Sequence, residues 1–331
     1  MNFKPMNFKL LMTALLLGTA QAAPLQDVSL ALDWTPNVNH IGVYVAQQQG
    51  WYAQAGVKLR ILPYGTASPE VLVTAGRADV GISGSESVTA AQVSANPVVS
   101  IAAILGTNTA AFAVLQRSAV TRPRQLDGKI YAAFGAPYEA PIVGRLIRSD
   151  GGQGTFKSPV LSAGGLSALL SGRADFMWIF EGTEGVEARR QGTPLRTFSM
   201  TKFGVPDYYT PVFVADPKGL NTTSPRLRAF LKATARGYEY ARAHPKEAAA
   251  LMLRALPKGT FPDPGVLTDG ATWLSTHNAY ARPGQPWGVQ SLKVWTDFPA
   301  FLLKNGAVKD PQGKTVTKLE YAKLFTNELL R

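Results

Sequence analysis

The sequence of 331 residues contains no cysteine and only three histidines. The absence of cysteine excludes disulfides, thiolate nucleophiles, thiolate zinc sites and iron–sulfur clusters. His40, His244 and His277 lie far apart in the sequence, and no HExxH motif is present. We therefore expect neither a metal site nor another cofactor. After the first residues no apolar run is long enough for a membrane-spanning helix, which needs about 20 residues.

Acidic residues are few, with 22 Asp and Glu against 34 Lys and Arg, a formal net charge of +12 at pH 7. The basic residues are scattered, and clusters such as Arg122 with Arg124 stay short. Nucleic-acid binding depends on a basic patch or on basic residues interleaved with aromatic ones. Nucleic acid is therefore not an expected partner.

The first 22 residues have the pattern of a cleavable export signal. Lys4 and Lys9 precede the apolar stretch Leu10–Leu17, and Ala20-Gln21-Ala22 supplies the small-x-small pattern of a cleavage site. No cysteine follows, so a lipid-anchored N-terminus is not expected. We predict a soluble periplasmic or secreted chain that begins near Ala23, with a formal side-chain charge of 12 − 2 = +10 once both lysines are removed.

The apolar fraction of 46% can supply cores for two domains. Short apolar strand patterns at Val28–Leu32, Val57–Leu62 and Ala78–Ile82 alternate with helical patterns at Ile41–Ala46 and Val71–Ala75. This β-α-β-α-β order predicts an α/β fold with a largely parallel sheet.

The segment Val71–Ile82 is echoed by Leu166–Met177. Both predict an apolar helix ended by glycine, a Gly-Arg-Ala-Asp turn and a short strand. Two such copies indicate two similar lobes, which the strand-like stretches 111–115 and 211–215 would connect. We therefore predict a signal peptide at 1–22, a first lobe at 23–115 plus 211–331, and a second lobe at 116–210.

The segments Leu32–His40, Val43–Ala46, Gln49–Tyr52 and Ala75–Ile82, preceded by an export signal, resemble ABC-transporter solute-binding proteins. Within that group they resemble the branch that binds thiamine pyrimidine precursors, which is related to hydroxymethylpyrimidine synthase and to sulfonate-, nitrate- and taurine-binding proteins. The resemblance implies the type II bilobed periplasmic-binding-protein fold, in which two mixed-sheet lobes are joined by two crossover strands.

The same resemblance implies a monomer that binds a flat nitrogen heterocycle in the cleft and delivers it to the membrane permease and ATPase subunits of an importer. The related synthases carry a cysteine-rich run that this chain lacks. That departure favours binding over catalysis.

Five candidate ligand-binding residues lie in the first lobe: Trp34, Asn37, His40, Ser83 and Glu86. Trp34 follows a strand at the edge where ligands of α/β sheets bind, and its indole could stack on a flat ring. Glu86 could accept hydrogen bonds from an aminopyrimidine and would repel an anion. The alternatives are a Trp34 packed under a loop, Asn37 and His40 stabilising the turn, and Glu86 complementing a helix dipole.

Five further candidates lie in the second lobe: Gly135, Tyr138, Trp178, Glu181 and Glu184. Gly135 and Tyr138 follow a predicted strand, and the two acids follow the strand that contains Trp178. Glu181 or Glu184 is expected to be the second carboxylate at the ligand. The alternatives are Trp178 as a core residue, which its position inside the strand favours, and Glu184 solvating a helix start. Tyr208 and Tyr209 are weaker candidates.

Three functions remain open at this point. The first is periplasmic capture of a thiamine pyrimidine precursor, such as hydroxymethylpyrimidine or its formylamino form, for an ABC importer. The second is binding of another small solute: riboflavin, an alkanesulfonate, taurine or nitrate. The third is an enzyme, either a pyrimidine-forming synthase or a secreted hydrolase, although no Gly-x-Ser-x-Gly elbow or catalytic triad is visible.

Overall fold

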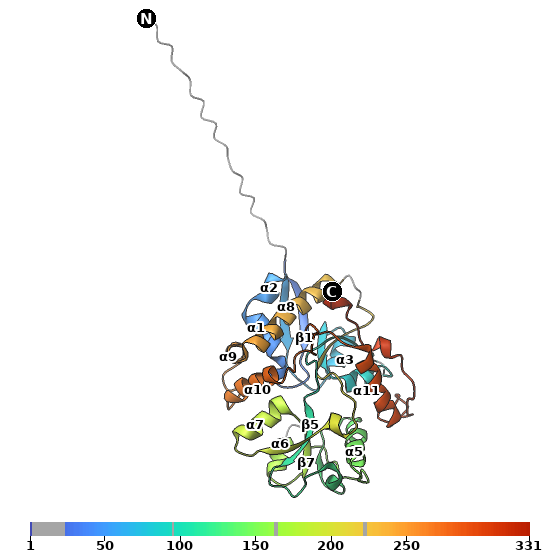
Figure 1. Ribbon diagram of the computed structural model, residues 1–331. Coiled ribbons are helices and arrows are strands. Elements are labelled where there is room, and N and C mark those ends of the chain that lie inside the picture. Colours follow the sequence, from blue (N-terminus) through green and yellow to red (C-terminus); the bar gives the residue numbers. More distant parts are fainter. Residues whose placement is uncertain (2–23, 95, 162–164, 221–223) are drawn as a thin grey trace.

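The computed structural model describes residues 1, 24–94, 96–161, 165–220 and 224–331, and the chain forms two lobes (Figure 1). The predicted signal peptide lies outside the described residues apart from Met1. Within the described ranges, no helix has the length and apolar character needed to cross a membrane.

The first lobe is built on a five-stranded mixed sheet with the order β2-β1-β3-β9-β4. β1 pairs in parallel with β2 and β3, whereas β9 is antiparallel to both of its neighbours. The strands are β1 (Gln26–Ala31), β2 (Val57–Leu62), β3 (Val80–Ser83), β4 (Val99–Ala103) and β9 (Val212–Ala215). The β-α-β-α-β order predicted for residues 28–82 is therefore present.

Helices cover both faces of this sheet, whose strands β3, β4 and β9 are buried at every position. One face packs on α1 (Ile41–Gln48), α8 (Pro225–Ala243), α9 (Pro245–Ala255) and α10 (Gly265–Thr276). The other face packs on α3 (Pro69–Thr74) and α4 (Ser85–Ala91). The short elements η1 (Val38–His40) and α2 (Trp51–Gln54) flank α1.

The second lobe has a four-stranded sheet with the order β6-β7-β5-β8, in which β6 and β7 are parallel. Its strands are β5 (Ala110–Leu115), β6 (Tyr131–Ala132), β7 (Phe176–Phe180) and β8 (Leu195–Ser199). The other elements are η2 (Pro123–Leu126), α5 (Glu139–Ser149), α6 (Gly165–Leu170), η4 (Glu181–Gly185), α7 (Val186–Arg190) and η5 (Met200–Phe203). The bilobed α/β architecture with two mixed sheets agrees with the predicted fold class.

The predicted lobe boundaries need correction in two places. β5 pairs with β7 and β8 and belongs to the second sheet, so the first connection between the lobes precedes residue 110 instead of following residue 115. In addition, α11 (Leu292–Lys304) inserts Phe298, Phe301 and Leu302 into the core of the second lobe, although residues 211–331 were all assigned to the first. The stacking of Phe298 on Tyr208, with ring centroids 4.0 Å apart, anchors this helix.

The two Gly-Arg-Ala-Asp turns have the same structure in both lobes, as their sequence similarity predicts. Gly76 and Gly172 adopt φ values of 68° and 73°, which glycine tolerates without strain. Asp79 accepts a hydrogen bond from the backbone N–H of Ser29, and Asp175 accepts one from Ile130, each at 2.8 Å. In each lobe this aspartate ties the turn to the neighbouring strand.

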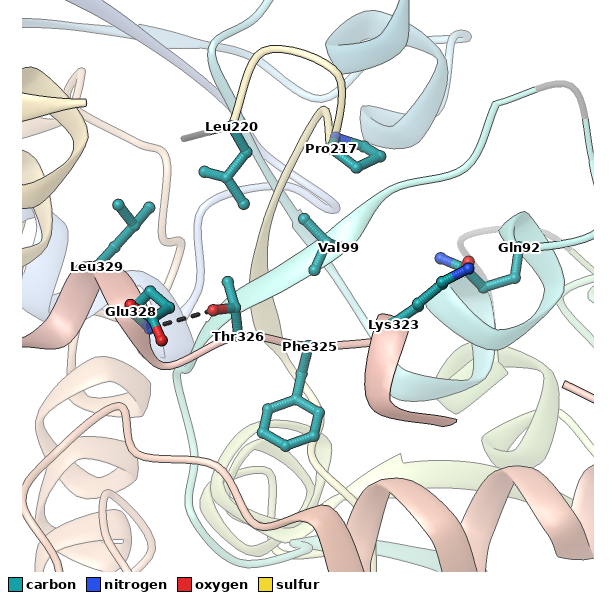
Figure 2. A pocket seen from close by; sticks show the side chains of 9 residues that line it. All are labelled: Gln92, Val99, Pro217, Leu220, Lys323, Phe325, Thr326, Glu328 and Leu329. Atoms are coloured by element: carbon teal, nitrogen blue, oxygen red, sulfur yellow. Dashed lines mark hydrogen bonds between the residues drawn. The ribbon is translucent and has the colours of Figure 1, made fainter. Parts of the chain in front are cut away.

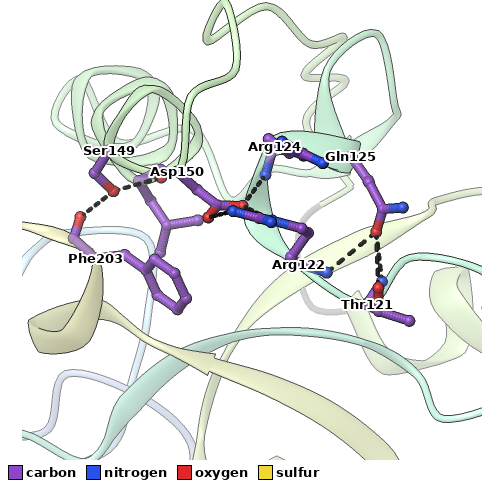
Figure 3. Close-up of polar contacts among 8 residues, drawn as sticks. Thr121, Arg122, Arg124, Gln125, Ser149, Asp150 and Phe203 are labelled. Atoms are coloured by element: carbon purple, nitrogen blue, oxygen red, sulfur yellow. Dashed lines mark hydrogen bonds and ion pairs between the residues drawn. The ribbon is translucent and has the colours of Figure 1, made fainter.

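Some of the scattered basic residues are engaged within the protein. Arg122 donates to Asp150 through Nε at 2.8 Å, and the Arg124 backbone N–H donates to the same carboxylate at 2.9 Å (Figure 3). The Arg122 guanidinium lowers the pKa of Asp150 to about 2. These contacts hold η2 against the end of α5, which gives this basic pair a structural role.

An ion-pair cluster joins the two lobes at one side. Arg190, at the end of α7, donates to Asp263 and Asp269 at 2.6 Å each. The backbones of α10 and η4 also approach each other closely. A Cβ added to Gly270 of α10 would lie 2.5 Å from the Gly182 carbonyl oxygen in η4. The segment that contains Glu181 and Glu184 is therefore packed directly against the first lobe.

Candidate functional site

The candidate residues gather at the carboxyl ends of parallel strands. In the first sheet, the loops after β1 and β3 carry Trp34 and Glu86, and in the second sheet the loops after β6 and β7 carry Tyr138 and Glu181. Parallel neighbours end at the same edge of a sheet, which is where ligands of open α/β sheets bind. Each lobe thus brings two of these loops together at one edge.

Trp34 is the most exposed candidate in the first lobe. Its relative exposure is 38%, and its ring lies 5.0 Å from that of Tyr64, which follows β2 at the same edge and is also exposed. The alternative of a tryptophan packed under a loop does not fit this exposure. Two neighbouring aromatic rings with open surface can stack on a flat ligand.

Asn37 and His40 are engaged inside their own loop. Asn37 Oδ1 accepts from the Asn39 backbone N–H at 2.9 Å and caps η1. His40 is fully buried, and its Nε2 lies 2.9 Å from Asp33 Oδ1. Its Nδ1 accepts from the Asn37 backbone N–H at 3.4 Å, so Nε2 carries the proton that is donated to Asp33. These contacts favour the turn-stabilising alternative for both residues.

We expect His40→Ala to lower the stability of the first lobe by about 1–3 kcal/mol, because the Asn37 N–H and the Asp33 carboxylate both lose a partner. Urea denaturation of the variant and the parent measures the difference. His277→Ala, an exposed histidine on the first lobe, serves as the control. Equal stability of the His40 variant and the parent would contradict the structural role.

Ser83 is the last residue of β3, and Glu86 lies in the first turn of α4. The Ser83 hydroxyl donates to Glu70 Oε1 at the start of α3. Glu86 is 5% exposed, and its Oε2 is buried without a hydrogen-bond partner. A Cβ added to Gly84 would lie 2.6 Å from this oxygen, so the glycine leaves room for the carboxylate to fold back over the strand end.

Burial raises the pKa of Glu86 to about 7, and the charges of Glu70 and Asp33 add to the shift. A buried carboxylate oxygen without a partner is costly unless a donor is supplied from elsewhere. The edge of the first lobe therefore combines negative charge with one acceptor that no protein donor satisfies. This combination favours a ligand that donates hydrogen bonds.

The stability of the protein is expected to fall as the pH rises from about 4.5 to 7. Across that window the folded protein keeps the Glu86 proton while the unfolded chain, with an ordinary glutamate pKa of 4.5, loses it. The full effect is about 3 kcal/mol and is constant above pH 7. Urea denaturation at pH 5 and pH 8 should show this loss in the parent and in the control Glu239→Gln, and a smaller loss in Glu86→Gln. An equal loss of stability in Glu86→Gln and in the parent would contradict the assignment of this pH dependence to Glu86.

The backbone of the loop after β6 is held in place by hydrogen bonds to the Glu139 carboxylate. The Glu139 carboxylate accepts from the backbone N–H groups of Phe134, Gly135 and Ala136 at 3.0, 2.6 and 2.5 Å, and from the Tyr131 hydroxyl at 2.8 Å. Gly135 has a φ of 99° and uses its N–H in this contact. The place where an anion would bind at this helix start is therefore filled by a carboxylate of the chain.

Tyr138 and Trp178 form an aromatic group in the second lobe. Their ring centroids are 6.4 Å apart, and Phe134 lies against both at 6.2 and 5.8 Å. Burial, and next the charge of Glu86 on the other lobe, raise the pKa of Tyr138. Trp178 is 8% exposed, yet its Nε1 has no hydrogen-bond partner. Tyr138 thus lies near Glu86 across the lobes, and Trp178 is a core residue with an unused donor.

Glu181 and Glu184 both lie in η4 and differ in their contacts. Glu184 Oε2 accepts from the Phe180 backbone N–H at 2.9 Å and from the Thr183 hydroxyl at 2.5 Å, so it stabilises the end of β7. Glu181 is weakly paired with Arg189 at 3.7 Å, and its backbone N–H donates to the Thr109 carbonyl at 3.0 Å. Of the two, Glu181 is the better candidate for ligand contact.

Comparison with known proteins assigns the chain to a family. The family described as NMT1/THI5 like matches residues 37–248, well over half of the chain. The chain belongs to the NMT1/THI5-like family. The resemblance inferred from the segments between Leu32 and Ile82 is thereby confirmed.

Two relatives of this NMT1/THI5-like protein and one solved structure with the same fold have informative names. It is 25% identical over 292 residues to the formylaminopyrimidine-binding protein of Halalkalibacterium halodurans, covering 87% of this chain and 88% of the relative. It is 26% identical over 241 residues to the 4-amino-5-hydroxymethyl-2-methylpyrimidine phosphate synthase of Legionella pneumophila, covering 71% and 75%. Its fold matches the periplasmic aliphatic sulphonate binding protein of Escherichia coli with a TM-score of 0.63 and 16% identity, over 88% and 90% of the two chains.

The structure adds polar groups that the sequence analysis of this NMT1/THI5-like chain missed. Glu70, in the first turn of α3, lies close enough to Glu86 for its charge to raise the pKa of that carboxyl. Asn108 and Thr109 end the first connection between the lobes, and Asn108 Nδ2 and Thr109 Oγ1 are buried without partners. The Tyr208 phenol lies beside Asn108 and Glu86, so this weaker candidate belongs with the group. In the sequence, the only feature that could have pointed to Asn108 and Thr109 is the polar run Thr-Asn-Thr at residues 107–109, directly before an apolar strand.

A separate cavity of about 350 Å³ lies beside β4, and none of the ten predicted residues lines it (Figure 2). The chain end covers it: Phe325 pairs with Ser100 of β4 and lines the cavity with Leu220 and Leu329. Lys323 and Glu328 also line it. Nothing in its lining matches the chemistry of the candidate site.

Proposed function

We propose that this NMT1/THI5-like protein is a solute-binding protein that captures a 4-aminopyrimidine of the thiamine-precursor type between its two lobes. The observation that carries the proposal is the Glu86 carboxylate, buried at the lobe edge with an oxygen that no protein group satisfies. The exocyclic amine of an aminopyrimidine, or its protonated ring nitrogen, supplies the missing donor. Exposed rings of Trp34 and Tyr64 at the same edge offer a stacking surface.

An anionic ligand is the less suitable alternative, although the E. coli sulphonate-binding protein shares the fold. Asp33, Glu70 and Glu86 place negative charge on the first lobe. On the second lobe, the Glu139 carboxylate already accepts the hydrogen bonds of the backbone N–H groups that an anion would use. A sulfonate or nitrate would meet like charge at both edges. The same charges attract a ligand that donates hydrogen bonds or carries a proton.

Lobe closure is the proposed mechanism of capture. In this structure the charge of Glu86 on the first lobe raises the pKa of Tyr138 on the second, after the larger effect of burial. Arg190 of the second lobe is paired with Asp263 and Asp269 of the first. We expect the free protein to sample forms in which these contacts open, and the ligand to favour the closed form because it touches both lobes. The closed form is then the one presented to the permease and ATPase of an ABC importer, with the protein acting as a periplasmic monomer.

An enzyme function is the second candidate, because the Legionella relative is named as a synthase. The chain lacks the cysteine-rich run of the eukaryotic synthases to which its sequence is similar. We therefore favour binding without turnover, and without a metal or cofactor. A ligand-derived product that accumulates with time would move the assignment to the enzyme class.

Isothermal titration with a panel of ligands tests the proposal. The panel contains 4-amino-5-hydroxymethyl-2-methylpyrimidine, its formylamino counterpart, riboflavin, an alkanesulfonate, taurine and nitrate. We expect saturable binding of the pyrimidines and a smaller radius of gyration in small-angle scattering when they are bound. Tight binding of a sulfonate or nitrate, without binding of the pyrimidines, would overturn the proposed function.

A further inference from the structure

We propose that Arg190 is a positioning residue that holds the two lobes together, so that its ion pairs with Asp263 and Asp269 set how long a captured ligand is retained. This inference rests on the proposed function and specifies how release from that site is controlled. Arg190 ends α7 of the second lobe, Asp263 precedes α10 of the first lobe, and Asp269 lies within α10. The helices α7 and α10 lie on one side of the molecule and α11 on the other (Figure 1).

The three side chains form a network of charge-assisted hydrogen bonds. Arg190 Nε and Nη2 donate to the two carboxylate oxygens of Asp263 at 2.6 and 3.1 Å, and Nη1 donates to Asp269 Oδ2 at 2.6 Å. Asp263 is itself oriented by the Gly265 backbone N–H, which donates to its Oδ1 at 2.9 Å. A guanidinium that binds one carboxylate through two hydrogen bonds and a second carboxylate through a third is fixed in direction. The network therefore defines one relative position of α7 and α10.

The guanidinium lies against bare backbone at the start of α10. A Cβ added to Gly265 would overlap Arg190 at Nη2 and Cζ, so only glycine leaves this space open. The Arg190 side chain is 34% exposed, whereas the two aspartates are 47% and 51% exposed. Isolated surface ion pairs contribute little, but a bidentate arginine in a network is the arrangement that does contribute. Its partial exposure leaves the network open to screening by salt.

The helix α10 also connects the ion pairs with the loops of the candidate site. A Cβ added to Gly270 would lie 2.5 Å from the Gly182 carbonyl oxygen in η4 and 3.3 Å from Val38 Cγ1 in η1. The loop after β1, which carries Trp34, leads into η1, and η4 contains the two acids that follow β7. When α10 separates from η4 and α7, the loop after β7 therefore moves away from the loop after β1.

The chain crosses between the lobes at other points, which are joined to one another. Asp207, before β9, accepts from the Asn108 backbone N–H at 3.3 Å, directly before β5. It also accepts from Arg282 at 2.6 Å, in the third crossing, between α10 and α11. A rotation of the lobes about these joined crossings opens the contact between α7 and α10 and breaks the Arg190 ion pairs.

Arg190→Gln is expected to raise the dissociation rate of a bound pyrimidine about threefold to tenfold, because the closed form loses its ion pairs while the ligand contacts are unchanged. Stopped-flow fluorescence with 4-amino-5-hydroxymethyl-2-methylpyrimidine measures this rate. Raising the salt concentration from about 0.01 M to about 1 M shortens the Debye length from about 30 Å to about 3 Å. The dissociation rate should rise with salt in the parent and rise less in Arg190→Gln.

Gly265→Ala tests the same contact without removing a charge. The added methyl group displaces the guanidinium, which is the end of a flexible side chain, whereas α10 remains folded because alanine is favoured over glycine in a helix. This variant should therefore release the ligand as fast as Arg190→Gln does. Arg254→Gln removes the same charge from an exposed position on α9 and should release the ligand at the rate of the parent.

The separation of the lobes can be measured without any ligand. Since the chain has no cysteine, Lys246→Cys on the first lobe and Lys157→Cys on the second place one spin label at an exposed position on each. Double electron–electron resonance should show longer distances between the labels in Arg190→Gln and Gly265→Ala than in the parent and Arg254→Gln.

Thermal melts establish that each variant is folded, and Gly265→Ala carries the test if Arg190→Gln is not. Unchanged label distances overturn the proposal. So does an unchanged dissociation rate when the parent binds the pyrimidine, in which case the proposed function stands. If the parent binds no pyrimidine, the proposed function fails, and the label distances alone decide whether Arg190 holds the lobes together.

Discussion

Glu86→Gln is expected to weaken the binding of a 4-aminopyrimidine ten- to hundredfold. The substitution keeps the shape of the side chain but removes a charge-assisted hydrogen bond worth about 1.5–3 kcal/mol. Isothermal titration at pH 8 measures the loss, because the carboxylate is ionised above its pKa of about 7. Trp34→Ala should cost a similar amount through lost stacking and buried area.

The matched control is an alkanesulfonate titrated against the same variants. Removing a carboxylate from an anion site would leave affinity unchanged or improve it, so the two ligand classes predict opposite signs for Glu86→Gln. Glu181→Gln should weaken pyrimidine binding, whereas Glu184→Gln should act mainly on stability, since Glu184 accepts from Phe180 and Thr183. Unchanged pyrimidine affinity in the Glu86, Glu181 and Trp34 variants would falsify the site assignment.

The order of strands and helices could be predicted from the sequence because local signals determine it. Ser68 and Pro69 open α3 as an N-cap and a first-turn proline, and Gly76 ends the segment with a positive φ. No comparable local pattern in the sequence shows which of the two lobes a strand belongs to. β5 is apolar at every position, and a strand buried on both faces has the same pattern in either sheet.

The positions of candidate residues at strand ends followed from the sequence, but their contacts did not. A histidine after a turn is consistent with ligand contact or with support of the turn, and only the folded loop brings Asp33 onto His40. Similarly, Glu86 becomes distinctive because Glu70 and Asp33, from other loops, lie near it. Asn108 was missed because its importance depends on the contacts with Ala110 and Asp207.

The contact between α1 and α8 supports the loop that carries the candidate site. α8 has an apolar face on which Phe230, Leu231 and Tyr238 are buried. The Tyr238 hydroxyl donates to the Asn39 carbonyl at 2.7 Å, and its ring stacks on Trp287 at 4.8 Å. The position of η1, and with it the Asp33–His40 loop, therefore depends on how closely α8 approaches α1.

Gly237→Ala is expected to destabilise the first lobe by about 3 kcal/mol or more, at the upper end of what overpacking costs. A Cβ at this position would lie 1.9 Å from the Gly42 carbonyl oxygen of α1, and helix backbones cannot yield as a flexible side chain can. Gly219→Ala, which meets nothing within 4 Å, is the control. Urea denaturation followed by circular dichroism measures both variants. Because helix propensity alone makes alanine more stable than glycine within a helix, equal or higher stability of Gly237→Ala would show that α1 and α8 pack less closely than described.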